Sequence, residues 1–233
     1  MALVAADGSI GTVRAADRYR DRRAVEYGIT LTPGGGARID WTRRYFGSAY
    51  TSFHREFAEM IPEERRRHFE RLVSSIAQSA AREGEPRAEY TTYPGVQTIT
   101  VTADPYAVRD GDLLYFTLPD GMTDLLRCDA DERTLPLYRD TFHRELMRFR
   151  IRVPEGFSPV RDEGRRAIML PDGVSTITRA SAYDPDSRIW TIEYEADLRP
   201  AVTEARDYDR LLEIGRELAL PAERTVIMRK NGS

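Results

Sequence analysis

The chain has 233 residues, of which 41% are hydrophobic and 31% are charged, and its formal net charge is −3. This length is enough for a sizeable hydrophobic core in one large or two small domains. Because both signs of charge are mixed in every segment, the composition argues against a protein that binds nucleic acid electrostatically.

The first 23 residues are interpreted as a lead-in segment (1–23). They include eight charged side chains and no apolar core of the kind that a signal peptide needs. No apolar run in the chain approaches the ~20 residues of a membrane span, so no membrane insertion is expected. Cys128 is the only cysteine, which excludes an internal disulfide.

A first unit, residues 24–121, begins with a predicted hairpin. Residues 24–46 alternate between apolar and polar on both sides of the Pro33–Gly36 turn, whose glycines allow positive φ. Because a strand follows this turn, it does not resemble a phosphate-binding loop, which leads into a helix. Residues 48–60 have helical spacing, and Pro62 opens a second helix.

Further strands are predicted after a turn at 84–86. They cover residues 87–93, 97–103 and 113–118. Residues 122–140 have the least regular pattern and are interpreted as a connector.

The second unit, residues 141–233, has the pattern of a β-sandwich with a closing helix. Its strands are expected at 147–153, 166–170, 174–183 and 189–198. A helix from Thr203 is stopped by Pro221, and a terminal strand from Thr225 to Met228 is the expected place for an unpaired sheet edge. The predicted fold class is therefore α+β, mainly β, with antiparallel β-sandwich-like units and two to four helices.

Two strands of the second unit carry rows of charge. Arg148, Arg150 and Arg152 lie on one face of a strand, and Glu193 and Glu195 lie on one face of another. If these strands are neighbours, cross-strand ion pairs explain both rows. The alternative is an arginine-lined surface that binds an anion or a polysaccharide.

Aromatic residues of the strands offer a second hypothesis. Trp41 and Tyr45 could stack on a sugar ring, although alternation on a hairpin more often directs such residues into a core. Trp41 therefore joins the charged residues as a candidate for the interaction surface.

Catalytic and metal chemistry have weaker support. Cys128 lies among carboxylates that would raise the pKa of its thiol, and it lacks the surroundings of a cysteine nucleophile. Asp129, Asp131 and Glu132 offer oxygen ligands without the spacing of a calcium loop. The sequence thus predicts no catalytic residue, no metal and no cofactor.

Several segments nevertheless form a recognisable order. They are Asp21–Leu31, Ala37–Asp40, Tyr50, Pro62–Arg66, Asp207–Leu212 and Arg224–Met228. This order resembles the region after the catalytic core in large bacterial transglutaminase-like proteins, a β-rich domain of unknown function. The resemblance implies a non-catalytic accessory domain whose parent protein is periplasmic or extracellular, and whose partner is the papain-like core of that parent, or another protein or polysaccharide.

Two other functions stay open from the sequence. A stand-alone carbohydrate- or peptide-binding β domain would place Trp41, Tyr45 or Trp190 in an exposed groove. A small cysteine hydrolase would bring Cys128 and His143 within hydrogen-bond reach.

Overall fold

The computed structural model describes residues 2–3, 10–11, 21–122, 126, 131–140, 142–160 and 164–232. About 48% of the described residues are in strands and 22% are in helices, with four α-helices in this part of the chain and mostly antiparallel sheets. The predicted class, α+β and mainly β, is confirmed.

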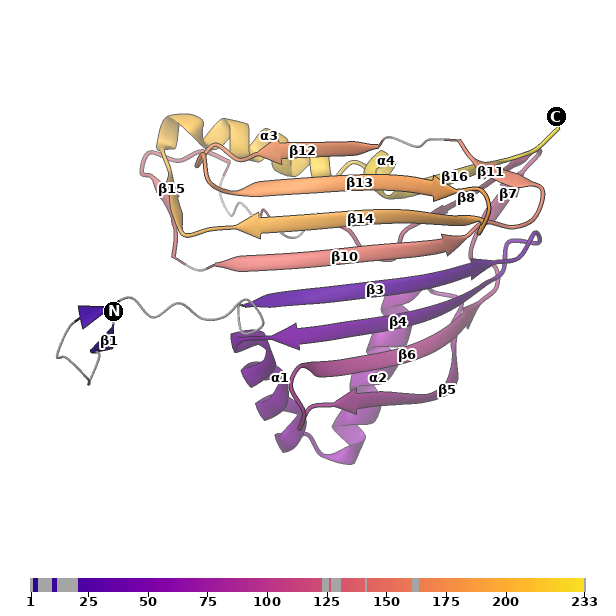
Figure 1. The fold of residues 1–233 in the computed structure, drawn as a ribbon, viewed down its shortest axis with the longest axis horizontal. Coiled ribbons are helices and arrows are strands. Elements are labelled where there is room, and N and C mark those ends of the chain that lie inside the picture. Colours follow the sequence, from indigo (N-terminus) through magenta and orange to yellow (C-terminus); the bar gives the residue numbers. More distant parts are fainter. Residues whose placement is uncertain are drawn as a thin grey trace.

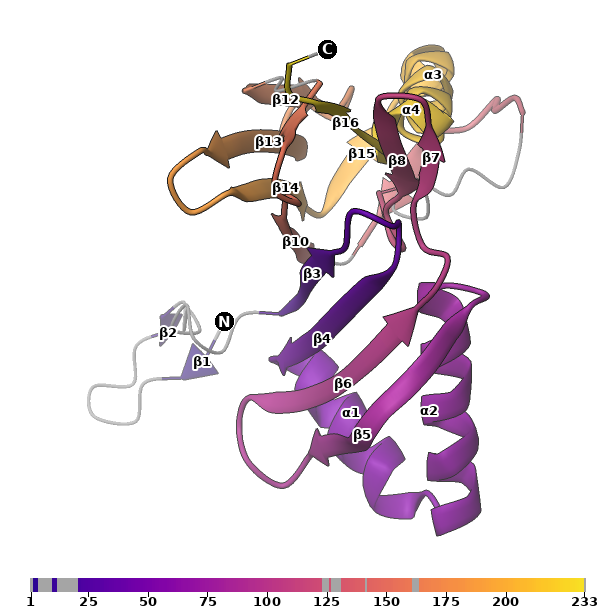
Figure 2. The same cartoon turned by 90° about the vertical axis from the view of Figure 1, so that its right-hand side faces the viewer.

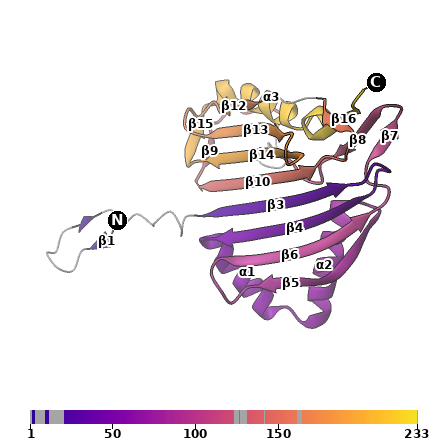
Figure 3. The same cartoon turned by 45° about the vertical axis from the view of Figure 1, so that its right-hand side comes forward.

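An eight-stranded sheet runs through the whole molecule (Figures 1 and 3). Its strands, in spatial order, are β12 (Arg165–Met169), β13 (Thr176–Asp184), β14 (Ile189–Leu198), β10 (His143–Arg152), β3 (Arg22–Leu31), β4 (Ala37–Phe46), β6 (Gly95–Ala103) and β5 (Ala80–Glu89). All neighbours are antiparallel except β10 and β3, which are parallel. Each of the two predicted units therefore contributes four strands to one shared sheet.

One face of this sheet is covered by two groups of elements (Figure 2). Helices α1 (Ser48–Glu59) and α2 (Pro62–Ile76) lie against the half formed by β4, β6 and β5. The other half is covered by α3 (Tyr208–Leu218), α4 (Pro221–Arg224) and a four-stranded sheet. That sheet has the order β11 (Phe157–Pro159), β16 (Thr225–Lys230), β8 (Leu113–Thr117) and β7 (Val108–Asp110).

The core lies between the large sheet and these covering elements. Every second residue of the central strands is buried there, as in Val25, Tyr27 and Ile29 on β3 and Phe149 and Ile151 on β10. The buried side chains of both halves form one contiguous cluster. Period-two alternation thus directs the apolar residues of both units to the same side of one sheet.

The turn predicted at 84–86 is a bulge inside an edge strand. β5 begins at Ala80, and its pairing with β6 shifts register between Glu83 and Arg87. Gly84 has φ 73° at this point, and Pro86 follows it. Because glycine and proline are tolerated at bulges of edge strands, the strand continues through residues that would end an interior strand.

The prediction of an unpaired edge at the terminal strand is wrong. β16 lies inside the four-stranded sheet and pairs with both β11 and β8.

Pro221 is the first residue of α4, where its missing N–H and fixed φ suit a helix start.

Four very short strands and one 3-10 helix, η2 (Ala205–Asp207), complete the described elements. β1 (Ala2–Leu3) pairs with β2 (Ile10–Gly11), within the lead-in segment. β9 (Leu137–Arg139), from the predicted connector, pairs with β15 (Ala201–Thr203).

Candidate functional site

The face of the large sheet opposite to the core, here called the open face, carries the even-numbered residues of β3, β4 and β10. Arg148, Arg150 and Arg152 all lie on it, on β10. No described helix or strand lies over this face, which is turned to the viewer in Figure 1 and lies away from the helices in Figure 2. The structure therefore brings the predicted row of arginines to an accessible surface.

Several arginines of the open face form ion pairs. Arg148 lies directly opposite Glu193 on β14, with 2.5 Å between Nε and Oε1, so the predicted cross-strand pair is present there. Glu195 instead pairs with Arg144, also at 2.5 Å. These side chains are between one third and one half exposed, so each pair contributes on the order of 0–1 kcal/mol to stability.

Arg150 and Arg152 differ from these paired arginines. Both are exposed, and no carboxylate of the described residues forms an ion pair with either. Arg150 lies between Gly28 on β3 and Thr191 on β14, and Arg152 lies beside Thr30. Glycine and threonine provide no negative charge, so both guanidinium groups remain available for an anionic partner.

Trp41 does not belong to the open face. It lies at an odd-numbered position of β4, on the covered face, and is only 1% exposed. Trp190 is also buried and donates its indole N–H to Ser181 Oγ at 2.7 Å. The inclusion of Trp41 in the interaction surface is wrong, because the alternation of the hairpin places the indole in the core.

Cys128, weighed above as a nucleophile, and Asp129, weighed above as an oxygen ligand, lie outside the described residues. His143 Nε2 lies 3.0 Å from Glu145 Oε2 and 3.4 Å from Arg23 Nη2. In the part of the chain that the structure describes, no group of three or more His, Cys, Asp or Glu side chains is suited to hold a metal ion.

A polar cluster on the covered face was not anticipated from the sequence. At one edge of it, Arg23 on β3 lies 3.3 Å from Glu145 on β10. The Glu145 side chain is 12% exposed. Burial raises the pKa of Glu145, but the hydrogen bond with His143 and the charge of Arg23 outweigh burial and hold this pKa below its usual value.

The centre of this cluster contains a second carboxyl group with the opposite behaviour. Tyr27 donates its hydroxyl to Asp120 Oδ2 at 3.3 Å, and the N–H of Gly121 donates to Oδ1 at 2.9 Å. Burial raises the pKa of Asp120, and the charge of Glu145 acts in the same direction. Arg43 on β4 opposes this shift through its positive charge. Within one cluster, the pKa of Glu145 is thus lowered and the pKa of Asp120 is raised.

A hydrogen-bond chain extends from the cluster into the helical layer. Tyr45 donates to Gln97 Oε1 at 2.6 Å, and Gln97 Nε2 lies 2.9 Å from His68 Nε2 on α2. Since Nε2 of the amide is a donor, this chain assigns the His68 proton to Nδ1. Burial lowers the pKa of His68, so the neutral imidazole is favoured.

The sequence did contain a signal for this cluster. Arg23, Arg43, Gln97, His143 and Glu145 all occupy strand positions with the same parity as the buried apolar residues. Polar residues at core-facing positions interrupt the alternation that otherwise marks these strands. Only the sheet order shows that the interruptions of four separate strands lie side by side.

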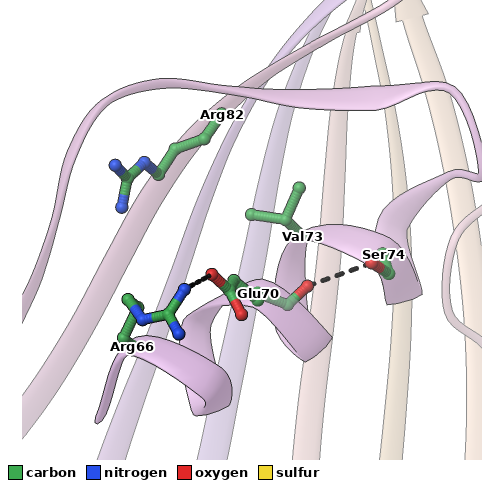
Figure 4. Close-up of a pocket in the computed structure, with 5 residues that line it drawn as sticks. All are labelled: Arg66, Glu70, Val73, Ser74 and Arg82. Carbon is green, nitrogen blue, oxygen red and sulfur yellow. Dashed lines mark hydrogen bonds and ion pairs between the residues drawn. The ribbon is translucent and has the colours of Figure 1, made fainter. Parts of the chain in front are cut away.

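A groove of about 480 Å³ lies between α2 and β5 (Figure 4). It is lined by Arg66, Glu70, Val73, Ser74 and Arg82. Arg66 forms an ion pair with Glu70 at 2.7 Å inside the groove, and Ser74 Oγ donates to the Glu70 carbonyl. With its charges paired in this way, the groove offers less unmatched charge than the open face does.

Comparisons with known proteins add little to this description. No protein-family model matches the chain, and no curated protein matches it. A crystal structure from Parabacteroides distasonis, of a protein provisionally named a protease, matches 52% of this chain at 13% identity and a TM-score of 0.42. The match spans 24% of that protein, and a likeness of this degree carries no argument about function. None of the helices in the described part of the chain has the length and apolar composition that a membrane crossing requires.

Proposed function

We propose that the chain is a non-catalytic interaction domain that binds a carboxylate-bearing partner protein through its open face. One observation carries this proposal: Arg150 and Arg152 have no described ion-pair partner, whereas the arginines around them form ion pairs. A guanidinium group forms bidentate hydrogen bonds with a carboxylate, and such charge-assisted bonds are stronger than neutral ones.

The open face is large enough for a specific interface. Its central strands have ten residues each, and eight strands lie side by side. With about 3.3 Å of rise per residue and about 4.8 Å between strands, the face measures roughly 33 Å by 34 Å. Its area, roughly 1,000 Å², exceeds the ~800 Å² that each partner buries in an ordinary stable interface.

The paired charges of the open face favour selective binding. Glu193 and Glu195 hold Arg148 and Arg144 in fixed positions, and they repel a partner that is uniformly acidic. Arg150 and Arg152, two residues apart on one strand, present two positive charges about 7 Å apart. A matching partner therefore carries carboxylates at a similar spacing.

The resemblance to transglutaminase-like proteins supports the catalytic core of such a protein as the partner. A carbohydrate ligand has less support, because Trp41 and Trp190 are buried and leave no exposed indole platform. The cysteine hydrolase has no supporting geometry, because Cys128 lies outside the described residues.

The proposal is tested by titrating the chain against a separately expressed transglutaminase-like core of its parent protein in a calorimeter. The variant Arg150→Glu/Arg152→Glu is expected to weaken binding at least about tenfold, because two charge-assisted contacts become repulsive. A charge-matched control, Arg55→Glu/Arg71→Glu, changes two exposed arginines of α1 and α2 on the opposite side of the sheet.

Binding should also weaken as salt is added, since exposed charges are screened within about 10 Å at 0.1 M salt. Association that both double variants weaken equally would show only a net-charge effect and would refute a role for the open face. No association at all would exclude the core as the partner.

A further inference from the structure

The strand β12 is one of the two outermost strands of the eight-stranded sheet (Figure 1). It pairs with β13 along Arg165–Met169 without a shift in register. A hydrogen bond continues the pairing at each end of the strand. At one end the N–H of Leu170 donates to the carbonyl of Ser175 at 2.9 Å. At the other end the N–H of Ser181 donates to the carbonyl of Gly164 at 2.7 Å.

These two hydrogen bonds determine which backbone groups of β12 face away from β13. In an antiparallel pair, residues that exchange hydrogen bonds alternate with residues that do not. Because the positions that flank the strand bond to β13, Arg166 and Ile168 also do so. The N–H and C=O groups of Arg165, Ala167 and Met169 therefore point outward, and no other described residue forms a hydrogen bond with them. These outward groups are here called the free edge.

The opposite edge of the same sheet is protected against pairing with another chain. On β5, the register with β6 shifts between Glu83 and Arg87. Within this shift, Gly84 has a positive φ and Pro86 has no N–H. Bulges and prolines prevent edge strands from pairing with other chains. β12 contains neither, so its free edge can still pair.

The free edge is complementary to itself under a two-fold rotation. If two copies of β12 pair antiparallel about an axis at Ala167, this alanine lies opposite its own copy. Arg165 of each copy then lies opposite Met169 of the other. Every residue of the free edge meets another residue of the free edge, so all the outward N–H and C=O groups find partners.

The side chains on the open face fit this register. Arg165, Ala167 and Met169 lie on that face, in line with Glu193 and Glu195 two strands away. Met169 is 60% exposed in the single chain, and the aliphatic part of Arg165 from the second copy would cover it. Like charges do not lie directly opposite each other, because arginine faces methionine and alanine lies at the axis.

The covered face does not oppose the pairing either. Arg166, which lies opposite Ile168 of the second copy, forms ion pairs within its own chain with Glu217 and, at 3.5 Å, with Glu223. Its charge is therefore matched before the two copies meet. α3, which carries Glu217, lies on the covered side of the sheet and not in line with it (Figure 2).

We propose that the chain forms a homodimer in which two copies of β12 pair antiparallel at their free edges and join both eight-stranded sheets into one. The two-fold axis is perpendicular to the sheet, so both open faces lie on the same side. The interface consists of one short strand from each copy, and we expect a dimer that dissociates on dilution. This inference does not depend on the partner proposed for the open face.

Sedimentation of the full chain over a series of concentrations, from micromolar to millimolar, tests the dimer. The apparent mass should rise from that of one chain towards that of two as the concentration increases. A mass that stays at that of one chain over the whole series would overturn the proposal.

Hydrogen exchange of individual amides tests the register. Raising the concentration should slow exchange at Arg165, Ala167 and Met169 at least about tenfold more than at Arg166 and Ile168, which bond to β13 in both states. A dimer without this alternating protection would form through another surface, and the assignment to the free edge would be wrong.

Two variants of Ala167 test the axis. Ala167→Arg places two guanidinium groups directly opposite each other and should weaken dimerisation at least about tenfold. Ala167→Pro removes an outward N–H, which an edge strand tolerates in the single chain, and should weaken dimerisation as well. The matched control, Ala81→Arg, changes an exposed alanine of β5 at the opposite edge and should have no effect. Dimerisation that both Ala167 variants leave intact, or that Ala81→Arg weakens equally, would overturn the assignment.

Discussion

The substitution Gln97→Leu tests the hydrogen-bond chain that joins the sheet to α2. Gln97 is 1% exposed and bonds with Tyr45 at 2.6 Å and His68 at 2.9 Å. Leucine keeps most of the volume but has neither donor nor acceptor, so two hydrogen bonds are lost. At about 0.5–1.5 kcal/mol each, the free energy of unfolding should fall by about 2 kcal/mol. A protein of this size should then melt about 4–8 °C lower.

Urea unfolding followed by tryptophan fluorescence measures this loss, because Trp41 and Trp190 are both buried in the folded chain. The matched control is Thr98→Val on the same strand, which faces the other side of the sheet and should change the free energy by less than about 0.5 kcal/mol. A Gln97→Leu loss no larger than the control would refute the assigned role of the chain.

A double-mutant cycle with Tyr45→Phe separates the two hydrogen bonds. Tyr45→Phe removes the hydroxyl group that donates a hydrogen bond to Gln97 Oε1. If this bond stabilises the protein, the effects of Tyr45→Phe and Gln97→Leu should be non-additive by at least about 0.5 kcal/mol. Simple additivity would show that the two side chains contribute independently.

Three further perturbations have outcomes that the structure specifies. Trp41→Ala should cost about 3–5 kcal/mol in urea unfolding followed by circular dichroism, because the indole fills the core; a loss below about 1 kcal/mol would contradict its burial. Gly35→Ala should cost more than about 2 kcal/mol, since a Cβ would lie 2.4 Å from the carbonyl oxygen of Ala107 at φ 94°, whereas Gly34→Ala meets nothing closer than 3.8 Å and should change less than about 1 kcal/mol; equal melting temperatures would contradict this. Glu145 has a lowered pKa in the folded state, so its contribution is complete above its ordinary pKa of 4.5 and is lost as the pH falls through the folded value; Glu145→Gln should flatten the acid side of the stability profile, and an unchanged slope in urea unfolding would refute this.

Local patterns predicted most of the individual elements. The hairpin of β3 and β4, both helices α1 and α2, and the strand β14 (Ile189–Leu198) lie where the periodicity placed them. These segments have clear period-two or helical spacing and are bounded by glycine or proline. Elements of three residues, such as β7 and β11, lack the length for a detectable period and were missed.

The candidate sites were less predictable than the elements. The Arg148 and Glu193 pair required that two strands separated by about 40 residues become neighbours, which the sequence raised only as a condition. The polar cluster combines residues of four strands, β3, β4, β6 and β10, with Asp120, which follows β8. No local pattern carries information about which strands of different hairpins lie next to each other.

The sequence by itself determined the class of the fold and which residues of each strand face the core, because alternation fixes the two faces of a strand wherever it pairs. Only the tertiary structure decided that β3 and β10 pair in parallel, which joins two four-stranded halves into one sheet. That long-range pairing places Arg150 and Arg152 on a shared open face and gathers Arg43, Asp120 and Glu145 beneath it. The physical reason is that strand order depends on the burial of surfaces distant in sequence, which local spacing does not encode.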